Sequence, residues 1–332
     1  MREFNPQLME SLRLITEEEK KFLEGKNEID RGVYVSSDSI NPDVFEARKL
    51  LEAGKLISIR KHTRFVHFPK HTHNYVEVMY MCSGSTSHII NGDHVTLETG
   101  ELLFLNQKAT QEIFPAGEDD IGVNFIILPA FFDYALTMQE DEENLLRTFI
   151  LDGLTGQGES SYLHFKVSDM LPVQNLVENL IWTLMNHQPN KRSTYQATMG
   201  LLIIQLMNNI DRVETDSLSE NEKFIMLVLS YIEEHYRDGE LSELAENLHY
   251  DFYWLSREIK KRTGQTYTEL VQIKRLSQAA YLLSHTAMAV SDVAIAVGYE
   301  NISYFHKLFR KNYNMSPKKY RDYMSIGVPR DI

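Results

Sequence analysis

The sequence contains a single cysteine, Cys82, so no disulfide can form within the chain. Proteins without disulfides are typical of reducing compartments, and we therefore expect a cytoplasmic protein. The first residues, MREFNPQLMESLRL, lack the basic start and apolar core of a secretory signal peptide. The longest apolar run, IGVNFIILPAFF, is too short to cross a bilayer and is interrupted by Asn124 and Pro129. The sequence predicts no membrane association.

Positive charge is also scarce over the whole chain. The 34 Lys and Arg residues face 47 Asp and Glu residues, which gives a net charge of −13. Residues 251–321 are the exception, since they contain 12 basic and 5 acidic residues and carry a local net charge of +7. Binding to nucleic acid requires only such a local basic face, so the overall charge does not exclude it.

The middle of the chain changes from a strand pattern to a helix pattern. From about residue 61 to 130, runs such as VEVMYM and ELLFLN alternate with turn sequences such as SGS and NGD, which is typical of a sandwich or barrel. Helical periods follow near 172–187 and 194–213. The second carries apolar residues at the 4-3-4-3 spacing of a coiled coil: Met199, Ile203, Leu206, Ile210 and Val213. This spacing fits either a dimer seam or a helix packed on its own barrel.

The C-terminal region contains an internal repeat with an offset of about 50 residues. LSELAENL (241–248) and VSDVAIAV (290–297) each place apolar residues on one helical face around a small alanine. Each is followed by a short turn and a second helix, DFYWLSREIKKRTG or NISYFHKLFRKNYN. A helix, a tight turn and a second helix with basic outer positions form the helix-turn-helix pattern. The repeat therefore predicts two such units.

The apolar spacing of each second helix turns its large residues inward and leaves polar residues outside. The outward candidates for DNA contact are Tyr253, Ser256, Arg257, Lys260 and Lys261, and Ser303, His306, Lys307, Arg310 and Lys311. Arg257 suits a bidentate contact to guanine, whereas Lys260 and Lys307 suit phosphate contacts. For any one of these residues, a solvated surface charge is the alternative interpretation.

A long helix is predicted between the two units. Thr266 and Glu269 form a capping box at the start of YTELVQIKRLSQAAYLLSHT. About 19 residues at about 1.5 Å each give a rod of about 28 Å. Successive major-groove faces of DNA are about 34 Å apart, so this rod could hold two recognition helices in neighbouring grooves.

The segment 283–321, LSHTAMAVSDVAIAVGYENISYFHKLFRKNYNMSPKKYR, resembles the C-terminal signature of AraC/XylS-type transcription regulators. The resemblance includes the motifs Gly298-Tyr299, Tyr304-Phe305, Phe309-Arg310-Lys311 and Ser316-Pro317. The first unit matches through Trp254-Leu255-Ser256-Arg257 and Lys260-Lys261 and departs at Glu258 and Ile259, where larger apolar residues are usual. The resemblance implies sequence-specific binding to an operator in double-stranded DNA.

The stretch FPKHTHNYVEVMYMCSG resembles the first motif of cupin barrels, with His71, His73, Glu77 and Gly84 at the expected spacing. On strands the odd-numbered His71, His73 and Glu77 share one face, which we expect to be the barrel interior. Cupins place a fourth ligand, a histidine, where this chain has Gln111. His71, His73 and Glu77 alone remain weak candidates for a divalent metal site.

Three interpretations of this barrel stay open: a catalytic metal cupin, a structural or sensory metal site, and a metal-free barrel that binds a small effector. AraC-type regulators with cupin-like domains generally use the third, which we favour, with no cofactor. The effector-contacting candidates are then His71, His73, Glu77, Met79 and Gln111. A metal-dependent cupin enzyme with a helical accessory domain is the main alternative function, and a protein-binding scaffold is another.

The sequence as a whole predicts an α+β protein that is a transcription regulator and not an enzyme. The expected parts are a helical N-terminal arm (1–60), a cupin-like barrel or double-stranded β-helix (61–135), a helical dimerisation region (136–213), a linker (214–221) and a double helix-turn-helix domain (222–326). The expected partners are operator DNA, a small effector of sugar-like character and a second copy of the chain in a homodimer. RNA polymerase is a candidate partner.

Overall fold

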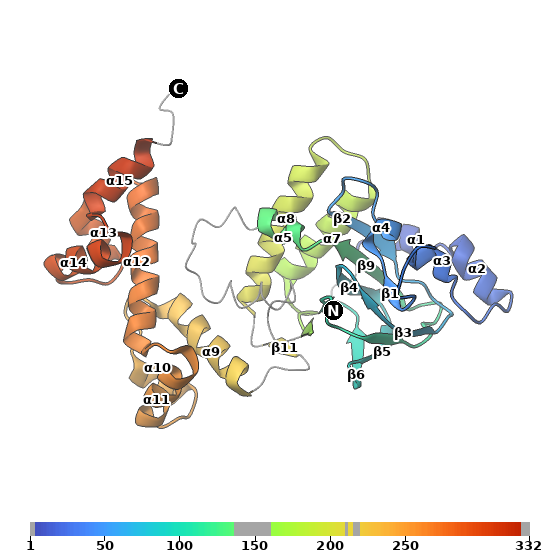
Figure 1. The fold of residues 1–332 in the computed structure, drawn as a ribbon, viewed down its shortest axis with the longest axis horizontal. Coiled ribbons are helices and arrows are strands. Elements are labelled where there is room, and N and C mark those ends of the chain that lie inside the picture. The colour runs from blue at the N-terminus through green and yellow to red at the C-terminus, as the bar shows by residue number, and fades with distance from the viewer. Residues whose placement is uncertain (1–3, 136–160, 210–211, 215–219, 327–332) are drawn as a thin grey trace. The chain divides into compact units, whose positions relative to one another are not determined.

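The computed structural model describes residues 4–135, 161–209, 212–214 and 220–326. These residues form two compact units, one before and one after the junction at residue 218. The N-terminal unit combines two β-sheets with helices, and the C-terminal unit is helical (Figure 1). No helix in the described part of the chain has both the length and the apolar character required to span a membrane.

Two sheets form the core of the N-terminal unit. The six-stranded sheet, in the order β11-β10-β7-β4-β9-β2, contains β2 (Ile57–Lys61), β4 (Val76–Ser83), β7 (Leu102–Leu105), β9 (Ile121–Ile127), β10 (Tyr162–Phe165) and β11 (Val213–Glu214). The five-stranded sheet, in the order β1-β3-β8-β5-β6, contains β1 (Val44–Phe45), β3 (Phe68–His73), β5 (Ser85–Ile90), β6 (Asp93–Glu98) and β8 (Gln111–Ile113). Neighbouring strands are antiparallel except β1 and β3, which run parallel. The predicted cupin-like two-sheet architecture is confirmed.

Apolar side chains from both sheets meet between them. Met79 and Met81 of β4 and Leu103 of β7 pack with Ile90 of β5 and Val95 of β6. Burial of such side chains is the main favourable term in folding. The other face of β4 is also buried, because α7 (Leu171–Met185) covers it and the Tyr80 hydroxyl donates a hydrogen bond of 2.6 Å to Gln174.

Turn residues at two points fit the strand predictions. Asn91 and Gly92 both have positive φ, at 53° and 104°, and they close the β5–β6 hairpin between the paired residues Ile90 and Asp93. A two-residue turn of this type favours Asn-Gly. Gly84, the last residue of the cupin-like motif, has φ +70°, and a Cβ there would lie 2.1 Å from Asp120 Oδ1. Only glycine fits this position without a shift of the backbone.

Short helices precede the sheets and are fixed to them by a buried ion pair. The helices of this unit are α1 (Pro6–Arg13), α2 (Glu17–Leu23), α3 (Arg31–Tyr34), α4 (Ala47–Leu50), α5 (Ala130–Ala135), α7 and α8 (Lys191–Met207). Arg64 Nε donates to Glu19 Oε1 at 2.7 Å, and Nη2 donates to the Arg13 carbonyl at 3.3 Å. Both charged side chains are almost fully buried. A buried pair of this kind holds the first two helices in place, because separating it would leave an uncompensated charge.

The coiled-coil spacing of residues 199–213 corresponds to burial within the unit. Met199, Ile203 and Leu206 are at most 2% exposed and belong to α8, which packs against α7. Val213 lies on β11, and Ile210 lies outside the described residues. Of the two interpretations of this spacing, the structure therefore agrees with a helix packed on its own domain. The sheets also include β1, β2, β10 and β11, which lie wholly or mostly outside the predicted barrel residues 61–135. The sequence did not predict these strands, because such short strands carry too few residues to show a period.

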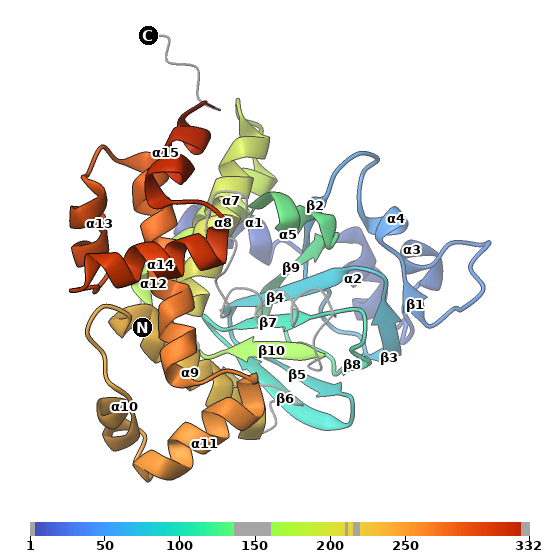
Figure 2. The same cartoon turned by 60° about the vertical axis from the view of Figure 1, so that its left-hand side comes forward.

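The C-terminal unit is built around one long helix, α12 (Figures 1 and 2). Its helices are α9 (Glu220–His235), α10 (Leu241–Asn247), α11 (Phe252–Thr263), α12 (Tyr267–His285), α13 (Val290–Ala296), α14 (Ile302–Tyr313) and α15 (Pro317–Ile326). The predicted caps are present: Asp251 Oδ1 accepts from Trp254 N at 2.9 Å, and Asn301 Oδ1 accepts from Tyr304 N at 3.0 Å. The capping box at Thr266 is also formed. Helix pairs α10–α11 and α13–α14 are the two predicted helix-turn-helix units.

Candidate functional site

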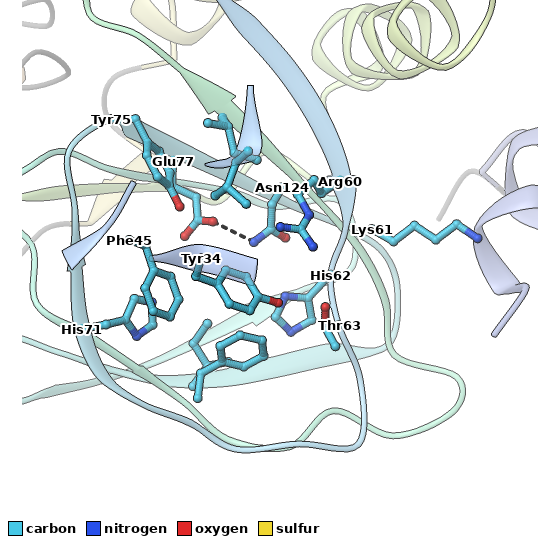
Figure 3. Close-up of a pocket in the computed structure, with 14 residues that line it drawn as sticks. Tyr34, Phe45, Arg60, Lys61, His62, Thr63, His71, Tyr75, Glu77 and Asn124 are labelled. Carbon is cyan, nitrogen blue, oxygen red and sulfur yellow. Dashed lines mark hydrogen bonds between the residues drawn. The ribbon is translucent and has the colours of Figure 1, made fainter. Parts of the chain in front are cut away.

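A small cavity lies in the N-terminal unit beside the cupin-like motif (Figure 3). Its volume of about 40 Å³ has room for a few water molecules. Strands β2, β3, β4, β8 and β9 and the segment before β2 contribute to its wall. The lining residues are Tyr34, Phe45, Leu50, Arg60, Lys61, His62, Thr63, Phe68, His71, Tyr75, Glu77, Ile113, Asn124 and Ile126.

Aromatic rings form one side of this cavity. The rings of Tyr34 and Phe45 stack at 4.6 Å between centroids, and Phe45 stacks on His71 at 4.0 Å. The Arg60 guanidinium lies over the Tyr34 ring at 5.1 Å, and it is 3.7 Å from a Glu18 carboxylate oxygen. Its charge is therefore shared with the ring and with an acidic side chain.

Polar groups face the rings. Asn124 Nδ2 donates to Glu77 Oε1 at 2.9 Å, the bond drawn in Figure 3. Asn124 Oδ1 and His62 Nε2 are buried and have no partner at strict hydrogen-bond geometry among the described residues, although the two side chains interact with each other. Buried polar atoms normally have a well-formed bond, so a ligand or water could complete the hydrogen bonding of these two side chains. Aromatic walls with a few converging polar groups are typical of small-molecule sites.

The five candidates for effector contact separate into two groups. His71 and Glu77 line the cavity. His73, Met79 and Gln111 are buried nearby, in a second set of contacts: Gln111 Nε2 lies 3.1 Å from His88 Nδ1 and 3.4 Å from Met79 Sδ. Gln111 is opposite His71 in the pairing of β3 with β8. The cupin-like positions thus face the interior, but only two of them reach this cavity.

These positions do not form a metal-ligand cluster in the described part of the chain, where no three His, Cys, Asp or Glu side chains converge. The His71 ring is turned so that Nδ1 lies 2.8 Å from the Pro69 carbonyl oxygen. His73 Nε2 is 3.4 Å from Glu77 Oε2, and neither His73 nitrogen has a partner at strict hydrogen-bond geometry among the described residues, although the Gln111 side chain interacts with the ring. The arrangement is that of separate interior polar groups.

Burial sets the protonation states of these groups. Loss of solvation lowers the pKa of His71 and of His73 to about 4 and that of His88 to about 3. Burial likewise lowers the pKa of His62 and raises the pKa of Glu77, although the bond from Asn124 opposes the latter shift. Near neutral pH these histidines are uncharged.

The polar or aromatic lining residues that were not among the sequence predictions include Tyr34, Arg60, His62 and Asn124. Asn124 carried a signal, since it is the polar residue that interrupts the apolar run of β9. Tyr34 belongs to the N-terminal segment, for which the sequence indicated no role, Arg60 lies on β2, and His62 directly follows β2. Their common location results from the pairing of β2 with β9, where Arg60 is opposite Asn124.

The C-terminal unit presents the predicted DNA-contact residues on α11 and α14. All ten side chains are exposed except Ser256, which is half-buried, and Tyr253 has the largest exposure at 73%. Leu255 and Ile259 of α11, like Phe305 and Phe309 of α14, are fully buried. The two helices therefore bury equivalent positions and expose equivalent positions fifty residues apart.

The departure at Glu258 from the family pattern has a structural explanation. Glu258 accepts from Arg262 Nε at 2.8 Å, and Lys261 Nζ lies 3.3 Å from its other oxygen. Arg262 in turn lies over the Phe224 ring of α9 at 4.4 Å. An ion pair capped by an aromatic ring thus occupies a place where an apolar side chain is usual, and it engages Lys261 on the flank of α11.

Comparison with known proteins agrees with both units. The family described as AraC-like ligand binding domain matches residues 54–192, and the family described as helix-turn-helix domain matches residues 244–323. The HTH-type transcriptional activator RhaS of Escherichia coli is 23% identical over 257 residues, which cover 76% of this chain and 87% of RhaS. The chain belongs to the AraC/XylS type of transcription regulators.

Two of the solved structures to which this chain is similar are the following. The C-terminal domain of AraT, a response regulator from Geobacillus stearothermophilus, is 32% identical, covers 32% of this chain and 88% of its own, and has a TM-score of 0.30. Unsaturated fatty acid bound wild-type ToxT from Vibrio cholerae is 15% identical, covers 83% of this chain and 97% of its own, and has a TM-score of 0.32.

As an AraC-type protein, this chain is a DNA-binding transcription regulator with an N-terminal ligand-binding domain. The matched families consist of regulators, so the alternative of a metal-dependent cupin enzyme is rejected.

Acidification is expected to destabilise the N-terminal unit of this AraC-type regulator. Unfolded histidines bind a proton near pH 6.5, whereas His71 and His73 do so near pH 4, so the unfolded state binds more protons in between. The free energy of unfolding should therefore fall as the pH drops from 6.5 to 4, by up to about 1.4 kcal/mol per pH unit for each histidine. The raised pKa of Glu77 has the opposite effect on the free energy of unfolding above its ordinary pKa of 4.5. It is one group, whereas several histidines act together.

Urea unfolding followed by Trp182 fluorescence, in a Trp254→Phe background, measures this dependence for the N-terminal unit. His88→Gln should flatten the slope, and the exposed His94→Gln is the matched control that should leave it unchanged. Equal unfolding free energies at pH 6.5 and pH 5 would show that the interior histidines are not neutral.

Proposed function

We propose that this AraC-type regulator places α11 and α14 in neighbouring major grooves of operator DNA and that a small neutral effector in the barrel cavity controls this binding. The observation that carries the proposal is the pair of helices with exposed basic residues, α11 and α14, which both pack against the long helix α12. Helix α12 has 19 residues, or about 28 Å at about 1.5 Å per residue, which approaches the spacing of one DNA turn.

The ten exposed residues of α11 and α14 are proposed to divide between bases and phosphates. Arg257 lies on the second turn of α11, where a recognition helix approaches base edges, and its guanidinium can contact guanine bidentately. The exposed ammonium groups of Lys260 and Lys307 and the guanidinium group of Arg310 are suited to contacts with phosphate oxygens. Phosphate contacts contribute to affinity on any sequence, whereas base contacts distinguish one sequence from another.

Substituting one residue of each class is expected to separate the two roles. Arg257→Ala should cost about 1–3 kcal/mol at a selected site and relax the preference at one base, whereas Lys307→Ala should weaken binding to all sequences and lower the salt slope by about one. Fluorescence anisotropy with a selected genomic fragment and a random duplex measures both effects. Lys26→Ala, an exposed lysine of the N-terminal unit, is the control. Equal losses on both duplexes in both variants would contradict the assignment.

The cavity favours an uncharged, hydroxylated effector such as a neutral sugar. Asn124, His62 and Glu77 offer hydrogen bonds, and the Phe45 and Tyr34 rings offer apolar surface. Among the described residues that line the cavity, both cations are engaged elsewhere: Arg60 lies beside Glu18, and Lys61 Nζ donates to the carbonyls of Ser11 and Leu14. Figure 3 shows Lys61 pointing away from the cavity. Burying a charge without a partner is costly.

Effector entry is proposed to move the N-terminal segment. Ligand sites usually occupy about 300–1,000 Å³, far more than this cavity offers, so part of the wall has to shift outward. Tyr34, Phe45 and Leu50 belong to the segment between α2 and β2, whose preceding helices are held by Arg64 and Glu19. A shift confined to this segment would give the regulator two states with different effector affinity, which coupling to DNA binding requires.

Thermal unfolding in the presence of small molecules tests the effector class. Neutral monosaccharides should include one that raises the melting temperature of the wild type, because a ligand that binds only the folded state stabilises it. Asn124→Leu should abolish that increase, and Asn208→Leu, on the exposed end of α8, should retain it. Stabilisation by sugar acids or fatty acids alone would contradict the proposal of a neutral effector.

A homodimer through the outer face of α8 is also proposed. Leu201 is 52% exposed, and the half-buried Ala197 and Ile204 lie one turn away on either side. Self-complementary contact of such a stripe is the usual arrangement in a twofold dimer. Sedimentation equilibrium should give a dimer for the wild type and for Ser193→Arg, and a weakened dimer for Leu201→Arg. A monomeric wild type would overturn this part of the proposal.

Two further expectations rest on the regulatory function itself. We place the protein in the cytoplasm, where its DNA target and reducing conditions for the buried Cys82 occur together. RNA polymerase is proposed as the second protein partner, because a transcription regulator acts on initiation.

A further inference from the structure

Arg275 on α12 lies at a junction inside the C-terminal unit, where its guanidinium contacts three backbone carbonyls. Nε donates to the Tyr236 oxygen at 2.7 Å and Nη2 to the Arg237 oxygen at 2.8 Å, both just beyond the end of α9. Nη1 donates to the Gly298 oxygen at 2.9 Å, in the turn between α13 and α14. Helix α9 packs against α11 of the first helix-turn-helix unit, and the Gly298 turn belongs to the second unit. The Arg275 side chain thus links the parts of the domain that carry the two units.

The backbone contact at this junction is close. Gly298 has φ +90°, and a Cβ at this position would lie 2.5 Å from the Arg237 oxygen and 3.0 Å from Arg275 Cζ. Arg275 also lies 5.5 Å from the centroid of the Tyr299 ring. The neighbouring Lys274 forms an ion pair with Glu233 of α9, so two successive residues of α12 attach to the same helix.

Arginine suits this junction because its planar fork presents several donors at fixed angles. Carbonyl oxygens at the end of a helix lack partners within the helix and carry partial negative charge, so a cation there is stabilising. An ammonium group is a compact point charge on a flexible stem and does not present the same rigid fork to carbonyls on two elements.

We infer that Arg275 is a positioning residue that fixes the angle between the two recognition helices, and hence the spacing of DNA sites that the regulator accepts. The inference rests on the proposed function, in which α11 and α14 bind neighbouring grooves together. The Lys274–Glu233 pair holds α9 on α12, whereas Arg275 also bonds to the Gly298 turn of the second unit. Loss of the Arg275 side chain would therefore loosen the second unit relative to α9. A rigid pair requires one spacing, whereas a loosened pair tolerates several.

Binding of the full-length protein to spacing variants of one site tests this inference. The site is first selected from a random library by the wild type, and one or two base pairs are then inserted between its two contacted blocks. Each inserted base pair rotates one block by about 34° and moves it by about 3.4 Å. The wild type should lose about tenfold or more in affinity on insertion, a loss comparable with that of a mismatched base pair. Arg275→Ala should lose less than about threefold between the same probes.

Arg321→Ala is the matched control. Its guanidinium donates to the carbonyls of Leu283 and Met288, on the second unit and its side of α12, so this variant removes comparable bonds while leaving the bridge to α9. It should lower the melting temperature and keep the spacing preference of the wild type. If Arg275→Ala only lowered stability, it too would keep the spacing preference of the wild type.

Gly298→Ala provides a second, independent perturbation of the junction if Arg275→Ala does not fold, because its methyl group would push the turn away from Arg237 while Arg275 is retained. It should also broaden the accepted spacing. The inference is overturned if the folded junction variants show the same loss on insertion as the wild type. A wild type that selects no sequence, or only one block, would instead contradict the proposed two-unit binding.

Discussion

Both helix-turn-helix units of this chain pack against one helix, α12, and share its buried surface. Leu276, Ala279 and Leu283 of that helix form a core with the second unit, while Leu270 and Val271 are buried nearer the first unit. Because both units pack against α12, a shift of either unit on this helix changes the distance and the angle between the two. The length of α12 and the contacts around it therefore decide how far apart, and at what angle, the two basic faces of the domain can contact DNA.

The N-terminal unit meets a different constraint, since it buries histidines, a glutamate and an asparagine between two sheets. Hydrogen bonds to these groups are incomplete at His62 and Asn124, and burial holds the histidines neutral. Such an interior is costly unless a ligand or water completes it, which is consistent with a ligand-binding domain. The buried Arg64–Glu19 pair fixes the first helices outside this interior and leaves the segment that carries Tyr34 and Phe45 as its cover.

The helical half of the molecule could be predicted from the sequence because its signals are local. Asp251, Asn301 and Thr266 cap helices through bonds to residues within three positions, and the apolar spacing of α11 and α14 is repeated at one offset. The cavity could not be predicted in the same way, because Arg60 and Asn124 meet only through the pairing of β2 with β9. Heptad spacing in α8 has the same limit: a buried face and a dimer seam require the same residues.

Selection of DNA from a random library by the full-length protein tests the central claim, that two units on one helix bind DNA together. The account predicts an enriched motif with two conserved blocks about 10 base pairs apart, centre to centre, and a variable stretch between them. Enrichment of a single short block, or of no sequence, would show that the two units do not bind DNA as a pair.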